Sequence, residues 1–108
     1  MMDELKQHLK INELYDLYGG LLTERQQDAI VRYYSDNYSL AEIAELNGTS
    51  RNAVHETLKH AIGKLQDYES TLLLLEKRHR QRVLIAQLRE LELPIAAKTI
   101  LDELEKVV

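Results

Sequence analysis

The chain has 108 residues, which suits one domain with a buried core, and it contains no cysteine, so disulfide bonds, thiolate metal sites and thiol nucleophiles are excluded. Fourteen basic and eighteen acidic residues give a net charge of −4, which counts against strong non-specific nucleic-acid binding but permits a local basic face. The amino terminus is polar, and no apolar run approaches the ~20 residues that span a bilayer. We therefore expect a cytoplasmic protein without membrane insertion.

Two helices are predicted in the first third of the chain. Apolar residues recur at helical spacing between residues 5 and 18, and we expect Gly19 and Gly20 to end this helix through a left-handed glycine. Thr23 and Gln26 fit a capping box, in which each residue bonds the backbone N–H of the other. This box opens a second helix with the apolar positions Ala29, Ile30, Val31 and Tyr34.

The middle of the chain predicts a helix-turn-helix. Ser39 and Glu42 form a second capping box, and Asn47-Gly48 ends the short helix that it opens. Ser50 is the expected N-cap of the next helix. The inward stripe of that helix is predicted to be Val54, Leu58, Ala61, Ile62 and Leu65.

Helical periodicity continues to the carboxyl terminus. Gly63 weakens its helix by ~1 kcal/mol relative to Ala, and we expect it to mark a close helix contact or a bend. From Thr71 the apolar positions are Leu72, Leu75, Val83, Leu84, Leu88 and Leu91. Pro94 breaks the pattern and begins a last helix that carries Ile95, Ile100, Leu101, Leu104 and Val108.

No strand pattern occurs, so the predicted fold is all-α, with five to six helices and a helix-turn-helix that lacks a winged-helix hairpin. We divide it into a helix-turn-helix domain at residues 1–70 and a C-terminal helical extension at residues 71–108. The extension is predicted to serve dimerisation or partner binding.

The second helix of the helix-turn-helix carries the candidate nucleic-acid contacts, which are Arg51, Asn52, His55, Glu56 and Lys59. Such a helix can enter the major groove of DNA with its N-terminal residues at base edges. Glu56 would repel phosphate, although it could accept a hydrogen bond from cytosine. Acidic residues outnumber basic ones by one between residues 38 and 68, so a helical hairpin used only for packing stays open as the alternative.

The hydroxyl cap and arginine at Ser50 and Arg51 resemble the start of the matching helix in region 4 of bacterial sigma factors. The wider pattern resembles the YlxM family over about residues 11 to 78, through LYDLYGGLLT at 14–23, YSLAEIAE at 38–45, SRNAV at 50–54, DYE at 67–69 and LLEK at 74–77. This resemblance implies a helical, sigma region 4-like protein. It also implies a regulatory or accessory role in the signal recognition particle pathway, because such proteins tend to be encoded beside genes of that particle.

Two features of the C-terminal part point to partners. Lys77, Arg78, Arg80 and Arg82 form either a phosphate-binding patch, with the RNA of the signal recognition particle as a candidate ligand, or a solvated helix face. The apolar residues after Tyr68 exceed what a three-helix core needs, which predicts a homodimer or a partner such as the signal-recognition GTPase. The rival is a last helix that folds back over its own chain.

No enzyme signature is present, because Gly19-Gly20 lacks the Lys and Ser/Thr of a phosphate-binding loop and no nucleophile or carboxylate pair stands out. We expect no cofactor, no metal site and no small-molecule substrate. The tyrosines at 15, 18, 33, 34 and 38 are interpreted as core and rim in preference to a base-stacking platform. The leading hypothesis is a regulatory nucleic-acid-binding protein, and the alternative is an accessory factor of the signal-recognition GTPase or RNA without sequence-specific DNA binding.

Overall fold

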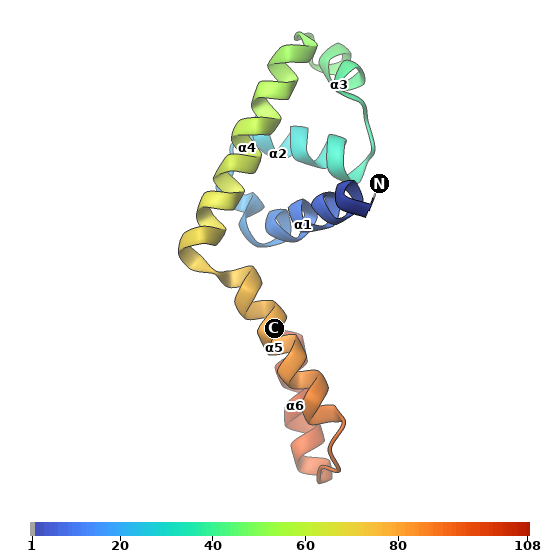
Figure 1. Ribbon diagram of the computed structural model, residues 1–108, viewed down its shortest axis with the longest axis vertical. Helices are drawn as coiled ribbons and strands as arrows, with labels where there is room; N and C mark the ends of the chain where they lie inside the picture. Colours follow the sequence, from blue (N-terminus) through green and yellow to red (C-terminus); the bar gives the residue numbers. More distant parts are fainter. Residues whose placement is uncertain (1) are drawn as a thin grey trace. The chain divides into compact units, whose positions relative to one another are not determined.

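The computed structural model describes residues 2–108 as helices joined by short turns (Figure 1). The helices are α1 (Met2–Tyr18), α2 (Glu24–Ile30), α3 (Leu40–Asn47), α4 (Arg51–Leu72), α5 (Leu74–Arg89) and α6 (Ile95–Val107). A 3-10 turn, η1 (Gly19–Leu21), follows α1, and a π-helical turn, η2 (Val31–Ser35), follows α2. The described residues contain six α-helices and no strand, which confirms the predicted all-α class. The chain forms two units, one ending at Leu72 and the other spanning Leu73–Val108.

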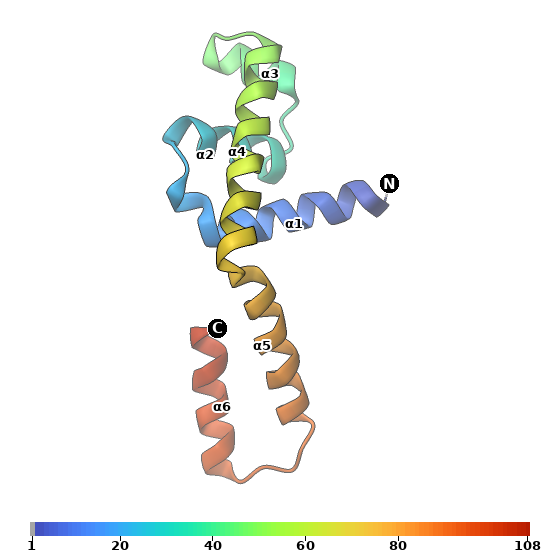
Figure 2. The same cartoon turned by 60° about the vertical axis from the view of Figure 1, so that its left-hand side comes forward.

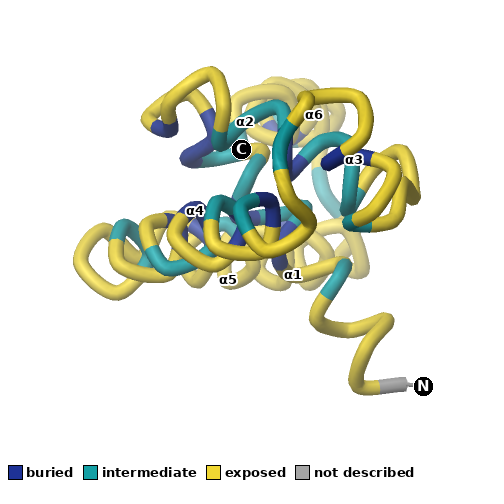
Figure 3. Tube along the Cα trace, turned by 90° about the horizontal axis from the view of Figure 1, so that it is seen from above, coloured by how far each residue is buried: buried dark blue, intermediate teal, exposed yellow. Residues whose placement is uncertain are grey.

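Helix α4 organises the first unit, because α1, α2 and α3 each contact it (Figure 1). Its buried positions, among those coloured dark blue in Figure 3, recur every three or four residues. The predicted inward stripe is confirmed except at Ile62, which is only half-buried. The buried hydrophobic residues of the unit are Ile11, Leu14, Tyr18, Leu22, Ala29, Ile30, Ile43, Ala44, Val54, Leu58, Ala61 and Leu65.

Hydroxyl caps begin the helices as predicted. Gln26 N donates to Thr23 Oγ1 at 3.2 Å, and Thr23 N donates to Gln26 Oε1 at 3.1 Å. Ser39 and Glu42 form the same reciprocal pair, with both distances at 3.1 Å. The first free N–H groups of α2 and α3 therefore find partners within their own segments.

The prediction of a left-handed glycine after α1 is wrong. Neither Gly19 nor Gly20 has a positive φ, and the chain leaves α1 through the 3-10 turn, in which Leu22 N donates to Gly19 O at 3.0 Å. A Cβ at Gly19 would lie 2.8 Å from ring carbons of Tyr15. Glycine is needed there because the Tyr15 ring lies against the backbone.

The segment after α2 also differs from the prediction, since the helix widens into η2 instead of continuing to Tyr34. Asp36 N donates to Val31 O and Tyr38 N donates to Arg32 O, each at 2.9 Å. π-Helical turns are rare in proteins overall, and those that occur are often found at functional sites. The expected close helix contact at Gly63 is wrong, since a Cβ there would meet nothing within 4 Å, and α4 continues through this residue to Leu72.

The second unit is a hairpin in which α5 and α6 run antiparallel (Figure 2). Pro94 is the N-cap of α6, so the last helix begins one residue later than predicted, and Lys98 N donates to the Pro94 carbonyl at 3.1 Å. Arg89 joins the two helices, with Nη2 2.7 Å from Asp102 Oδ1 and Nε 2.6 Å from Glu105 Oε1. The last helix thus folds back onto α5 within this unit, which was the alternative to a homodimer in the sequence analysis.

The hairpin buries few side chains, and these are Leu75, Ile85 and Leu101. The sequence pattern placed Val83 and Leu84 on the apolar stripe, but Ile85 is the buried position and both of the former are exposed. The apolar side chains that stay exposed on the two helices and their connection are Leu74, Val83, Leu84, Leu88, Leu91, Ile95, Ile100, Leu104 and Val107. The hairpin alone therefore does not cover its apolar surface.

Candidate nucleic-acid interface

The turn between α3 and α4 has the geometry that the sequence predicted. Gly48 adopts the left-handed conformation, with φ 65° and ψ 33°, and among the described glycines it alone has a positive φ. Thr49 N donates to Ala44 O at 3.0 Å, which closes the end of α3. Ser50 Oγ then accepts a hydrogen bond of 3.0 Å from Ala53 N, so the expected N-cap of α4 is present.

The five candidate contacts are all exposed and lie on one side of α4. Arg51, His55 and Lys59 are spaced by four residues, and Asn52 and Glu56 flank them. Val54 and Leu58 face the core from another side of the same helix. From residue 51 to residue 59 the helix rises about 12 Å, at about 1.5 Å per residue, which is a length that a major groove can receive.

The charge of this unit is acidic. Its sequence up to Leu72 holds twelve acidic and seven basic side chains, whereas the second unit holds six acidic and seven basic ones. On the candidate face, Arg51 and Lys59 outnumber Glu56, whose Oε2 lies 3.9 Å from His60 Nε2. A contact this long between exposed groups contributes little. The α4 face is therefore a small basic strip on an acidic unit.

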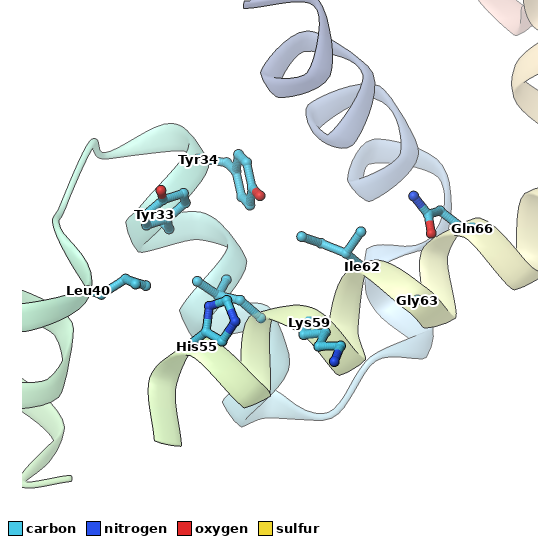
Figure 4. Close-up of a pocket in the computed structure, with 9 residues that line it drawn as sticks. Tyr33, Tyr34, Leu40, His55, Lys59, Ile62, Gly63 and Gln66 are labelled. Carbon is cyan, nitrogen blue, oxygen red and sulfur yellow. The ribbon is translucent and has the colours of Figure 1, made fainter. Parts of the chain in front are cut away.

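A groove of about 490 Å³ adjoins this face (Figure 4). Tyr33 and Tyr34 of η2 lie on one wall, and His55, Lys59 and Ile62 of α4 lie on the other. The full lining is Tyr33, Tyr34, Leu40, His55, Leu58, Lys59, Ile62, Gly63 and Gln66. This groove was not predicted from the sequence, because its two walls lie more than twenty residues apart along the chain; the mid-helix Gly63 was the available signal.

The tyrosines of η2 form an aromatic cluster with α1. The Tyr33 and Tyr34 ring centroids are 4.9 Å apart, and the His8 ring lies 4.7 Å from Tyr34 and 6.1 Å from Tyr33. Burial, and then the neighbouring Tyr33, raise the pKa of Tyr34 above its ordinary value. Of the predicted core and rim tyrosines, Tyr18 is 1% exposed and belongs to the core, Tyr33 and Tyr34 are half-buried at its rim, and Tyr38 is exposed.

The second candidate set does not share one helix face. Arg78 and Arg82 lie four residues apart on the side of α5 that carries Ile85, and Arg78 is half-buried. Lys77 and Arg80 project from other sides of the helix and are exposed. Phosphate binding by this set stays a prediction, and it would have to use two separate pairs of cations.

Two further observations concern metal ions and membranes. Among residues 2–108, no group of three or more His, Asp or Glu side chains is placed to hold a metal ion. Within the same range, each helix is too short or too polar to cross a bilayer.

Comparison with known proteins agrees with this geometry. The family model described as "UPF0122: Putative helix-turn-helix protein, YlxM / p13 like" matches residues 5–106. The chain belongs to this family. It is 45% identical over 86 residues to a UPF0122 protein of Clostridium botulinum, covering 80% of this chain and 79% of that protein. It is 37% identical over 107 residues to a UPF0122 protein of Shouchella clausii, covering 95% and 98%.

These matches confirm the YlxM resemblance and extend it. The motifs that resemble the YlxM family span about residues 11 to 78, whereas the family model matches the chain as far as residue 106, within α6. The C-terminal hairpin is therefore part of the pattern of the helix-turn-helix family. Membership of such a family favours a regulatory type of protein.

Proposed function

We propose that this protein regulates by binding nucleic acid through the N-terminal half of α4. The observation that carries the proposal is the exposed strip of Arg51, Asn52, His55 and Lys59 on a helix that Ser50 caps and Gly48 positions. Helix-turn-helix proteins contact base edges with this part of their second helix. Glu56 interrupts the strip and restricts which phosphates or bases can approach it.

We propose that this activity serves the signal recognition particle pathway, which is the role that the YlxM resemblance implies. Operator-like DNA and the particle's RNA are the two nucleic acids to compare. Because the unit that contains α4 is acidic, we expect weak non-specific binding and a dependence on the few cations of the strip. Cytoplasmic location and the lack of a small-molecule substrate remain expectations of the same proposal.

A titration with labelled nucleic acid tests the role of the strip. Arg51→Ala should weaken binding by ~1–3 kcal/mol if Arg51 reads a base, and Lys59→Ala should reduce the salt dependence. Lys64→Ala is the matched control, because Lys64 is an exposed cation on another side of the same helix. Binding that survives both Arg51→Ala and Lys59→Ala unchanged would remove α4 from the mechanism.

A second candidate function concerns the hairpin. Leu84, Leu88 and Leu91 remain 40–58% exposed although α6 already packs on α5. A contiguous apolar surface of this kind is uncommon on soluble monomers. We propose that two copies of the chain pair through this surface, as in dimers that present two helix-turn-helix units to symmetric sites. The signal-recognition GTPase is the alternative occupant.

A further inference from the structure

The groove beside α4 is open because of two local features. The π-helical turn η2 carries Tyr33 and Tyr34 to one wall, and Gly63 leaves the opposite wall without a side chain. Glycine is unfavourable inside a helix, and here no neighbour within 4 Å requires it. Close packing of helices therefore does not explain why residue 63 is glycine, whereas an open groove beside α4 does.

The apolar lining suits a flat ligand. Two tyrosine rings face the aliphatic side chain of Ile62, and Leu40 and Leu58 complete the apolar surface (Figure 4). Contacts with the His8 ring and with each other hold the tyrosines in place, so a ligand would meet aromatic groups that are already positioned. The volume of about 490 Å³ falls in the range of sites for small ligands or single residues of a polymer.

The polar groups of the groove select among flat ligands. Lys59 supplies a cation, and His55 and Gln66 supply groups that can hydrogen-bond the edge of a ring. An aromatic wall, a cation and edge-directed polar groups are together the features that bind a nucleotide of a single strand. His55 and Lys59 also belong to the exposed strip, so the groove is continuous with the proposed nucleic-acid contact.

We propose that this groove receives one unpaired nucleotide of the nucleic acid that α4 contacts, with the base against the tyrosines and its phosphate at Lys59. This inference rests on the proposed function and narrows it to a structured nucleic acid with an unstacked base, as bulges and loops of RNA present. Stacking of the base supplies affinity that does not depend on charge, which suits a unit with an excess of acidic residues.

The test compares two RNA hairpins that differ only in one bulged 2-aminopurine nucleotide. The full-length protein should bind the bulged hairpin about 5- to 150-fold more tightly than the paired one, which is the range that base stacking on an aromatic ring provides. The 2-aminopurine fluorescence should fall as the base stacks. Tyr33→Leu should remove the preference, and Tyr33→Phe should retain it.

Gly63→Leu provides the second arm, since its side chain would fill the groove. Leu is a better helix former than Gly, so this variant should stay folded, and circular dichroism checks that it does. It should lose the preference for the bulge and still bind the paired hairpin. Equal binding of both hairpins by the wild type, or a preference that Gly63→Leu leaves intact, would overturn the groove proposal. If neither hairpin nor duplex DNA binds, the proposed function itself fails.

Discussion

Two Gly→Ala substitutions in the first unit should change its stability in opposite directions. Gly63→Ala adds a Cβ in the interior of α4, where nothing beyond the helix backbone and the adjoining residues lies within 4 Å and φ is negative. The change should raise the free energy of unfolding by about 1 kcal/mol, which is the difference in helix propensity. For a domain of roughly 60–100 residues, that corresponds to a rise of about 4–8 °C in Tm.

Gly48→Ala should act in the other direction. Open space also surrounds a Cβ at Gly48, so no clash contributes, but its φ of 65° is costly for an L-residue with a Cβ. We expect a loss of about 1–2 kcal/mol, and Gly48→Asn should recover part of it because Asn tolerates the left-handed region. Thermal and urea unfolding followed at 222 nm measure all three variants. Destabilisation by both Gly→Ala changes, or by neither, would refute this account of the turn and of α4.

Three further outcomes follow from the caps, the hairpin and its charges. Ser50→Ala should cost ~1 kcal/mol in urea unfolding, since Ala53 N loses its acceptor. Leu88→Glu should convert a dimer to a monomer in sedimentation equilibrium, and a wild-type chain that is monomeric at tens of micromolar would rule out pairing through the hairpin. The hydrogen bond from Arg89 lowers the pKa of the Glu105 carboxyl below its ordinary value of 4.5. The ion pair of Arg89 and Glu105 therefore stabilises the hairpin at neutral pH, and this stabilisation is lost as the pH falls below about 4.5. Glu105→Gln should therefore reduce the dependence of the circular dichroism signal at 222 nm on pH in that acidic range. An unchanged pH dependence would contradict a stabilising role for the ion pair.

Local signals made much of the first unit predictable. A cap involves residues three apart, so Thr23 with Gln26 and Ser39 with Glu42 could be recognised from spacing alone. The left-handed Gly48 follows from the same local chemistry, since glycine ends a helix at low cost. These signals placed both helices of the helix-turn-helix and the exposed side of α4.

The features that were missed have no recognisable signal in residue type or spacing. Gly19 is needed because of the Tyr15 ring, and no turn motif encodes that contact. Leu73 has a φ of 55° and divides α4 from α5, although no glycine or proline in this segment indicates a helix end. Arg89 meets acidic residues 13 and 16 positions away, across the turn at Pro94. The groove likewise needs η2, which no residue of its segment distinguishes from ordinary α-helix.

The claim that α4 binds nucleic acid is tested most directly by backbone amide chemical shifts recorded as DNA or signal-recognition RNA is added to the full-length protein. If α4 binds nucleic acid, the largest changes should fall between residues 51 and 59, with smaller ones at Tyr33, Tyr34 and Gly63, and they should weaken as salt rises. Changes confined to the cations of α5, from residue 77 to residue 82, would contradict it and would assign nucleic-acid binding to the hairpin.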